Sequence, residues 1–351
     1  MDNNASSHLL AAHRVSQRSI AKHAGVSTST VSRVLNNVDG ISDELREHVL
    51  KIAASLGYHE PAAPGKLQHL HLFTTSFATM TAPHTFHPSI LDGVAAECRN
   101  HAILLSYAVI GQSAADRAAI ISQARERPGT GILLLSIDDR SLVEDLLALK
   151  LPVVLINADH RDLPVDTFLP NNFTGGLLAT RHLIAHGHQR ILHVTEPKTR
   201  RRSTLQRRLD GYRTALEEAH MPYDPALVLE SPLRVDDAHA AMRAWLNAQR
   251  APFSSVFCAN DASAIGVMRA LQEAGKRVPE DISVIGYDDV PVASLLTPAL
   301  TTLHVDCEEM GSLAVQRMIY RALKPDAAPI RVEVASRLVA RQSVAACAQE
   351  K

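Results

Sequence analysis

The stretch from Ser19 to Asn36 most strongly constrains the fold, because its residue spacing is typical of two short helices joined by a tight turn. Gly25 supplies the turn, where a positive φ costs glycine little. Val26 fills the angle between the helices, and Ser27 is placed to cap the second one. A helix pair of this kind places its second helix in the major groove of DNA.

The second helix of the pair has one apolar face and one polar face. Val31, Val34 and Leu35 recur at helical spacing and are expected to point inward. Short hydroxyl side chains suit close approach to base edges, and Arg33 can pair with guanine, worth about 1–3 kcal/mol of discrimination. A generic three-helix core would need the same apolar face, so the spacing alone leaves a structural role open. The residues expected to contact DNA in this segment are Arg18, Ser27, Thr28, Ser29, Thr30, Ser32, Arg33 and Asn36.

The formal net charge of −1 conceals a basic amino-terminal segment. Residues 14–33 contain Arg14, Arg18, Lys22 and Arg33 and no acidic residue. Such a segment suffices to engage phosphates, with a shallower salt dependence than very basic proteins show. We therefore expect double-stranded DNA as a partner of residues 14–60.

Length and composition are those of a soluble protein with two or three compact units. The chain has 351 residues, of which 46% are hydrophobic and 21% charged. No apolar run approaches the roughly 18 residues that a membrane span needs. The first residues, from Met1 to His8, lack the basic segment and long apolar stretch of a secretory signal. We expect a cytoplasmic protein with no membrane partner.

Cysteine and histidine spacing predicts neither a metal site nor a cofactor. The four cysteines form no C-x-x-C pair, and Cys258 lies in an apolar run, which favours a reduced core thiol. His182 and His186 share a helix face, but no cysteine or acidic partner stands nearby. The phosphate-binding and nucleophile-elbow motifs of common enzymes are missing. We expect no metal, no cofactor and no catalytic residue.

Beyond residue 60 the distribution of apolar and turn-forming residues along the chain changes twice. After a tail (1–13) and a small all-α unit (14–60), two prolines and a glycine mark a linker at 61–69. From residue 70 short apolar runs alternate with amphipathic stretches, which indicates parallel sheets covered by helices on both faces. This length exceeds one sheet, so we predict two lobes. The expected strands are 70–75, 103–109, 131–136, 153–157, 190–194, 255–258 and 282–286, and the expected helices are 88–100, 114–126, 139–149, 172–187, 204–220, 235–249 and 260–275.

Polar residues follow two of these strands directly. Asn260 and Asp261 follow the strand that ends at residue 258, and Asp288 follows the strand that ends at residue 286. Ligands of open parallel sheets bind beyond the carboxyl ends of strands, so these side chains could bind hydroxyl groups. Asn and Asp also cap helices. Capping is the stronger interpretation for Asn260 and Asp261, and ligand binding for Asp288.

The order of residues resembles one family along most of the chain. The stretch 19–36, with Ile41-Ser-Asp-Glu and Leu56-Gly-Tyr, resembles the opening of lactose/galactose-repressor family transcription regulators. The stretches 175–191, 208–216, 260–266, 278–289 and 298–303 resemble the effector-binding core of that family, which is similar to periplasmic sugar-binding proteins. The resemblance implies an α/β protein with a helix-turn-helix head and a two-lobed core. It also implies a sequence-specific repressor whose operator affinity is controlled by a small molecule.

The resemblance further implies how the core is divided and assembled. The chain is expected to cross between lobes near residues 188, 304 and 325, so lobe 1 would comprise 70–188 and 305–325, and lobe 2 would comprise 189–304 and 326–343. A dimer surface on the core is implied as well. The tail at 344–351 has no apolar heptads, so we expect a homodimer on a palindromic operator, with recognition helices about 10 bp apart.

Effector contacts are carried over position by position. Arg208 and Asp288 match the usual effector contacts of the family, and Asn260 matches a contact of some members. Arg202 and Thr204 match pocket positions of members with ligands other than sugars. The arginine-rich run 198–208 favours a carboxylate or phosphate ligand, although a solvated charged loop is an equal alternative for Arg200 and Arg201.

The chain departs from the family pattern at several of these positions. Asn171 stands where many members carry an aspartate, and Leu233 stands where an aromatic ring often stacks on the effector. The first strand leads into an unusual stretch with His84, Phe86 and His87. These departures disfavour a standard hexose as the effector. The expected effector contacts are Phe86, Asn171, Arg202, Thr204, Arg208, Leu233, Asn260 and Asp288.

The linker departs as well. Family members carry a short hinge helix that inserts a leucine into the minor groove. Leu67 stands at the matching distance from Tyr58, but Pro64 and Gly65 precede it and disfavour a helix. Leu67 is thus a DNA-contact candidate in a hinge that is shortened or partly non-helical.

Two rival classes of function stay open. A solute-binding protein with the same core would need a secretory signal, and none is visible. An enzyme could use His101 and His304, which lie near acidic residues, although helix surfaces carry such histidines routinely.

Overall fold

The computed structural model describes residues 16–35, 38, 40–56, 66–75, 85–110, 113–126 and 129–347. Two compact units share the chain, Met1–Ala63 and Pro64–Lys351. Of the sequence predictions, those on Asn36, His84 and the Pro64–Gly65 pair lie outside the described residues.

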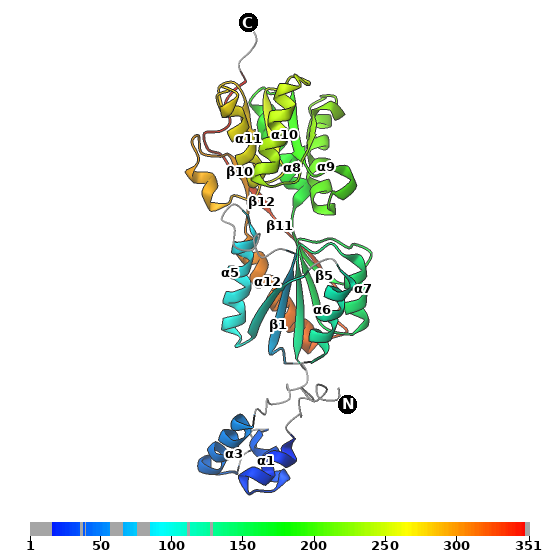
Figure 1. Ribbon diagram of the computed structural model, residues 1–351, viewed down its shortest axis with the longest axis vertical. Coiled ribbons are helices and arrows are strands. Elements are labelled where there is room, and N and C mark those ends of the chain that lie inside the picture. Colours follow the sequence, from blue (N-terminus) through cyan, green and yellow to red (C-terminus); the bar gives the residue numbers. More distant parts are fainter. Residues whose placement is uncertain are drawn as a thin grey trace, which may run out of the picture. The chain divides into compact units, whose positions relative to one another are not determined.

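The described part of the first unit contains three helices: α1 (Gln17–Ala24), α2 (Thr28–Leu35) and α3 (Asp43–Ser55) (Figure 1). Ser16 caps α1 by accepting a hydrogen bond from the Ser19 amide, and Gly25 ends it with φ of 66°. Ser27 Oγ accepts a bond from the Thr30 amide at 3.0 Å, which starts α2 as predicted. The helices enclose one small apolar core, made by Ile20, Ala21, Ala24, Val31, Val34, Leu35, Val49 and Ala53.

Lobe 1 of the second unit is built on a parallel sheet with the strand order β11-β5-β4-β3-β1-β2. Neighbouring residues of its strands face opposite sides. Leu133 packs with residues of α5 and α12, whereas Ile132 and Leu134 pack with residues of α6 and α7. These two pairs of helices cover opposite faces of the sheet (Figure 1). Its strands are β1 (His69–Thr74), β2 (Leu104–Val109), β3 (Thr130–Leu135), β4 (Val153–Ile156), β5 (Asp166–Pro170) and β11 (Arg331–Val334), and its helices are α5 (His87–Asn100), α6 (Ala114–Glu126), α7 (Arg140–Ala148) and α12 (Cys307–Leu323).

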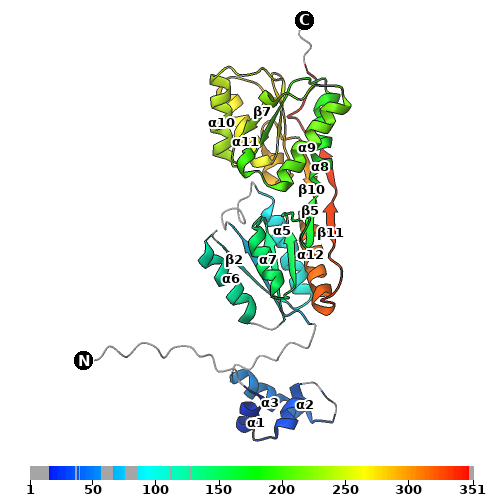
Figure 2. The ribbon, with the colours of Figure 1, turned by 90° about the vertical axis from the view of Figure 1, so that its right-hand side faces the viewer.

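Lobe 2 has a smaller parallel sheet with the order β7-β6-β8-β9. Helices α8 and α9 cover one face of this sheet, and α10 and α11 cover the other (Figure 2). Its strands are β6 (Ile191–Thr195), β7 (Val228–Glu230), β8 (Ser255–Cys258) and β9 (Ser283–Ile285). Its α-helices are α8 (Asn172–Ala185), α9 (Ser203–Glu218), α10 (Val235–Asn247) and α11 (Asp261–Glu273), and short 3-10 turns lie at Lys198–Arg200, Pro225–Leu227 and Pro291–Leu295.

The chain passes between the lobes three times. Helix α8 belongs to lobe 2, because a Cβ on Gly176 would lie 2.2 Å from the Arg208 carbonyl oxygen of α9. Strand β11 belongs to lobe 1, because it pairs with β5. The first and third crossings therefore fall near 171 and 335, not near 188 and 325 as expected. The second follows β10 (Thr302–Val305), which pairs antiparallel with β12 (Ser336–Val339).

Each of the seven predicted strands and seven predicted core helices has a counterpart within a few residues of its expected bounds. The glycine pair of α8 permits close packing, since Gly175 lies against the Tyr287 ring. Among the described residues, no helix is long and apolar enough to cross a membrane.

Candidate functional site

The polar face of α2 lies at the surface of the first unit. Ser27, Thr28, Ser29 and Arg33 are exposed, and Thr30 is half-buried. Ser27 Oγ lies 2.7 Å from Ser29 Oγ and 2.8 Å from Thr30 Oγ1, so the hydroxyls gather at the start of the helix. Helix N-termini with free amides and hydroxyl donors are suited to phosphate oxygens.

The other candidate DNA-contact residues differ in how exposed their side chains are. Arg18 is exposed and Ser32 is half-buried. Leu67 is only 4% exposed and packs in the core of lobe 1, where a Cβ on Gly131 would lie 3.0 Å from it. This buried position is not that of a side chain projecting into a minor groove, so the structure corrects the expectation for Leu67. Arg46, which the sequence did not single out, donates to Val38 O at 3.1 Å and closes the carboxyl end of α2.

Arg208 lies at the centre of a buried polar cluster in lobe 2. Its side chain is 3% exposed, and its Nε donates to Asn172 Oδ1 at 2.8 Å. Nη1 donates to the Ala259 carbonyl, and Nη2 lies 3.6 Å from Asp288 Oδ1. The guanidinium stacks on the Tyr287 ring at 3.5 Å. The start of α8 and the segments after β8 and β9 thus converge on one cation.

Asp288 is held in an unusual environment. It is 8% exposed, and its backbone has φ of 114°, a left-handed conformation that L side chains rarely adopt. Burial raises the pKa of its carboxyl to about 7, although Arg208 and Arg202 act in the opposite direction. Strained backbone and a displaced pKa in one residue are typical of functional sites.

Three arginines of the run 198–208, namely Arg201, Arg202 and Arg208, are already paired with acids. Arg202 binds Glu196 through Nη2 at 2.7 Å and through Nε at 3.1 Å, and its backbone amide also donates to this carboxylate. Arg201 binds Glu230 at 3.2 Å. Together with the Arg208–Asp288 pair, these contacts give three of the cations in this run a carboxylate partner.

A polar group in lobe 1 was missed by sequence reasoning. Ser136 follows β3, and Asn157 follows β4. Asn157 Nδ2 donates to Ser136 Oγ at 2.9 Å, and His87 Nε2 lies 3.1 Å from the same oxygen. His87 is 7% exposed, and burial together with the charge of Arg202 lowers its pKa to about 4. Because Arg202 belongs to lobe 2, the electrostatic environment of His87 includes a charge of the opposite lobe.

Several predicted effector residues have structural partners. Asn171 caps α8 by accepting from the Thr174 amide at 3.0 Å, and Asn260 caps α11 by accepting from the Ser263 amide at 2.9 Å. For Asn260 the favoured capping interpretation is therefore confirmed. For Asp261 it is wrong, because its buried carboxylate accepts hydrogen bonds from the Val290 amide at 3.0 Å and the Thr302 hydroxyl at 2.6 Å instead. Thr204 is buried near the start of α9, Leu233 packs beside the core of lobe 2, and Phe86 stacks on His87 with centroids 4.4 Å apart.

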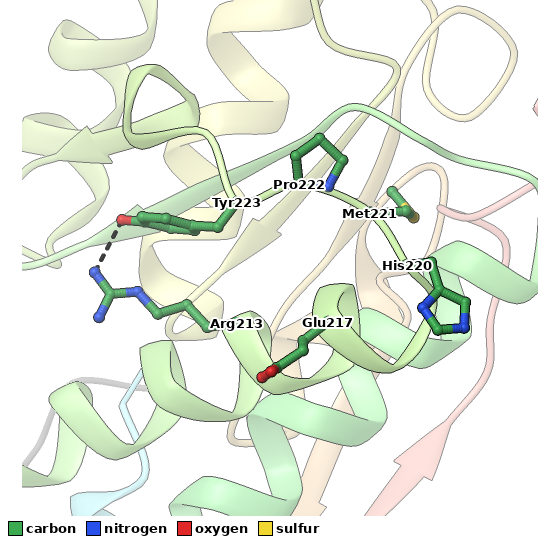
Figure 3. Close-up of a pocket in the computed structure, with 6 residues that line it drawn as sticks. All are labelled: Arg213, Glu217, His220, Met221, Pro222 and Tyr223. Carbon is green, nitrogen blue, oxygen red and sulfur yellow. Dashed lines mark hydrogen bonds between the residues drawn. The ribbon is translucent and has the colours of Figure 1, made fainter.

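A cavity of about 140 Å³ lies between residues of both lobes. Phe86 lines it from lobe 1 and Asp288 from lobe 2, with His304 of β10 beside them. A larger surface hollow, of about 660 Å³, lies on lobe 2 and is lined by residues 213–223 of α9 and the following loop (Figure 3). There the Arg213 guanidinium already donates to Tyr223 OH at 3.0 Å (Figure 3), and no predicted site residue takes part.

Replacing Asp288 by asparagine should change how stability depends on pH. The carboxyl binds a proton with a pKa near 7 when folded and 3.8 when unfolded, so the wild type loses stability as pH rises from about 4 to 7. Asp288→Asn removes this titration. Its free energy of unfolding relative to wild type should rise by about 2 kcal/mol between pH 5 and pH 7. Urea unfolding at both pH values measures the difference, and a constant difference would contradict the raised pKa.

Both units match families of known proteins. Residues 18–60 match the model of bacterial regulatory proteins of the lacI family, and residues 180–344 match a periplasmic binding protein-like domain. The ribose operon repressor of Haemophilus influenzae is 33% identical over 309 residues, covering 88% of this chain and 92% of that protein.

Solved structures agree with this result. A complex of the transcriptional regulator CelR with cellobiose has a TM-score of 0.72 and 30% identity, covering 93% of this chain and 99% of that one. The lac repressor dimer bound to operator and an anti-inducer has a TM-score of 0.75 and 26% identity, covering 95% and 99%. The chain belongs to the lacI family of bacterial regulatory proteins.

Proposed function

We propose that this DNA-binding regulator is a repressor that binds a palindromic operator as a homodimer. The observation that supports this proposal is the pairing of two features in one chain. The first unit exposes the hydroxyl-rich face of α2, and the second holds the Arg208–Asp288 pair at the strand ends of a two-lobed core. The relatives described above are named as regulators, not as enzymes, and we assign no catalytic step to these residues.

In this proposal a small molecule between the lobes controls operator affinity by shifting the balance between two arrangements of the lobes. Closure of the lobes would change how the two heads of the homodimer fit the operator. Coupling of this kind is commonly about 1–3 kcal/mol.

We further propose that the effector is an uncharged, hydroxyl-rich molecule. Arg202 and Arg208 already have carboxylate partners at 2.7 Å and 3.6 Å, so an anionic ligand would have to displace Glu196 or Asp288. This argument disfavours the carboxylate or phosphate ligand that the arginine-rich run suggested. A relative is named for the ribose operon, and a similar regulator was solved with cellobiose.

Thermal unfolding with matched probes tests the effector class. D-ribose or cellobiose should raise the unfolding midpoint, corresponding to about 2.7 kcal/mol at 100 times the dissociation constant. D-ribose 5-phosphate and D-gluconate should have little effect. Stabilisation by the anions alone would contradict the proposal. A mobility shift with genomic fragments, repeated with the stabilising probe, then tests control of operator binding.

A further inference from the structure

Tyr287 is a buried aromatic residue that follows β9 in lobe 2 and directly precedes Asp288. Its side chain is 0% exposed, and the Arg208 guanidinium lies 3.5 Å from the centre of its ring. A Cβ on Gly175 would lie 2.5 Å from its hydroxyl oxygen, so α8 leaves no free space beside this end of the ring. Because protein interiors are close-packed, a ring held in this way moves only together with its neighbours. A displacement of the Arg208 side chain is therefore expected to displace the tyrosine as well.

The hydroxyl group of Tyr287 binds the segment in which the chain makes its third crossing between the lobes. Its oxygen lies 2.8 Å from Ser336 Oγ, and Ser336 is the first residue of β12. Only Ala335 separates Ser336 from Val334, the last residue of β11 in lobe 1. Hinges between domains are formed by a few residues at the ends of such elements. The hydrogen bond therefore joins lobe 2 to the residues whose backbone must rotate when the lobes change their arrangement.

The first and second crossings also lie next to this tyrosine. Gly175, which packs against the ring, belongs to the first part of α8, and α8 begins just after β5 of lobe 1. The Asp288 amide donates to the Leu303 carbonyl of β10 at 2.8 Å, and Asp288 pairs with His304 in an isolated bridge. Tyr287 and Asp288 together thus contact all three segments that connect the lobes.

A second buried tyrosine shows what is special about the Tyr287–Ser336 bond. Tyr212 is 1% exposed, and its hydroxyl donates to the Ile191 carbonyl at 2.9 Å. Both of these residues belong to lobe 2, so their bond is the same in any arrangement of the lobes. The Tyr287–Ser336 bond joins lobe 2 to a crossing, so its free energy can differ between two arrangements. Only an interaction that differs between two arrangements can shift the equilibrium between them.

We propose that Tyr287 is a positioning residue that transmits effector binding at Arg208 to the third crossing through its hydrogen bond to Ser336. This inference rests on the proposed function, in which a small molecule between the lobes controls operator affinity, and deepens it by naming the contact. When an effector group binds the guanidinium, the ring stacked on it shifts, and the hydroxyl displaces Ser336. The backbone at Ala335 then rotates, and the lobes change their arrangement.

Fluorescence anisotropy of the full chain with a genomic fragment that it selects, without and with D-ribose or cellobiose, tests the proposal. For each variant, the ratio of the dissociation constants with and without the sugar measures control by the effector. Ser336→Ala removes the partner of the tyrosine hydroxyl and should reduce the effect of the sugar on this ratio about 3- to 10-fold, as expected for one buried hydrogen bond. Ser336→Thr keeps a hydroxyl group and should retain the wild-type ratio. Calorimetry should show that Ser336→Ala binds the sugar within about threefold of wild type, because Arg208 and Asp288 keep their partners.

Two tyrosine variants separate transmission from a loss of stability. Tyr287→Phe removes the other hydroxyl of the bond and retains the ring, so it should reduce the effect of the sugar as much as Ser336→Ala does. The double variant should reduce it no further, because both substitutions break the same bond. Tyr212→Phe breaks a buried tyrosine bond inside lobe 2 and should retain the wild-type ratio.

The possible failures of this test are distinguishable. If Ser336→Ala and Tyr287→Phe retain the wild-type ratio, or if Tyr212→Phe reduces the effect of the sugar as strongly, transmission through Tyr287 is refuted while the proposed function stands. A double variant that combines the full effects of both single variants also refutes it, because the two hydroxyls would then act separately. If neither D-ribose nor cellobiose changes the operator affinity of the wild type, the proposed control by an uncharged effector fails, and this inference fails with it.

Discussion

Deletion of residues 1–63 is expected to abolish specific operator binding while residues 64–351 still bind the effector. The division into two compact units makes this possible, because among the described residues no hydrophobic core cluster combines residues of both units. Specific binding exceeds non-specific binding by 10³-fold or more in most DNA-binding proteins, so the loss should be at least about 1,000-fold. Fluorescence anisotropy with a genomic fragment selected by the full chain measures it.

The control for this deletion is the full chain with a single change in α2. Arg33→Ala should weaken binding of the selected fragment by about 1–3 kcal/mol and relax its sequence preference, without altering the thermal response to the effector probe. A shift of the fragment by residues 64–351 alone, at the concentrations that suffice for the full chain, would show that the DNA-binding surface lies elsewhere.

The alternation of strands and helices in the second unit was predictable because its buried strands are apolar runs in the sequence. Strand β3, for example, is buried along its whole length, and its sequence shows this directly. The strands that were missed lack such a run. β5 begins at the buried Asp166 and ends at Pro170, β7 has three residues, and β11 lies at the sheet edge with exposed residues. Their positions depend on pairing partners far along the chain, which spacing cannot reveal.

The missed strands also explain the misplaced crossings. Asp166 accepts hydrogen bonds from Arg317, Arg321 and the Ile330 amide, so the end of α12 and the segment that follows it are bound to lobe 1. Nothing within 317–334 indicates a partner at residue 166. The expectation that lobe 2 resumes at 326 was therefore wrong by about ten residues.

Site residues were predictable where each could be recognised singly from its own position in the sequence. Arg208 and Asp288 were named from the sequence, and the structure brings them together. Ser136 and Asn157 end two predicted strands just as Asp288 follows another, so the strand-exit argument applied to them equally. Their significance depends on strand pairing, which places them side by side, and on His87 at the start of α5.

Arg208→Met is expected to abolish effector binding and to destabilise the protein. The substitution removes the donors to Asn172 and Ala259 and leaves the buried Asp288 without its cation. Breaking a buried ion pair from one side typically costs about 3–5 kcal/mol. Asp288 without its partner takes up a proton more readily, so the loss should be smaller at pH 5 than at pH 8. Urea unfolding at the two pH values gives the free energies, and calorimetry with D-ribose gives the affinity.

The double variant Arg208→Met/Asp288→Asn separates the two effects of the pair. With no charge left to bury, it should recover part of the stability at pH 8 and equal the single variant at pH 5. D-ribose binding should stay at least about 100-fold weaker than wild type, because both polar partners are gone. Recovery of stability together with binding would mean that the pair only holds lobe 2 together. Recovery of stability without recovery of D-ribose binding would mean that effector binding requires the buried Asp288, although its burial lowers the stability of the protein.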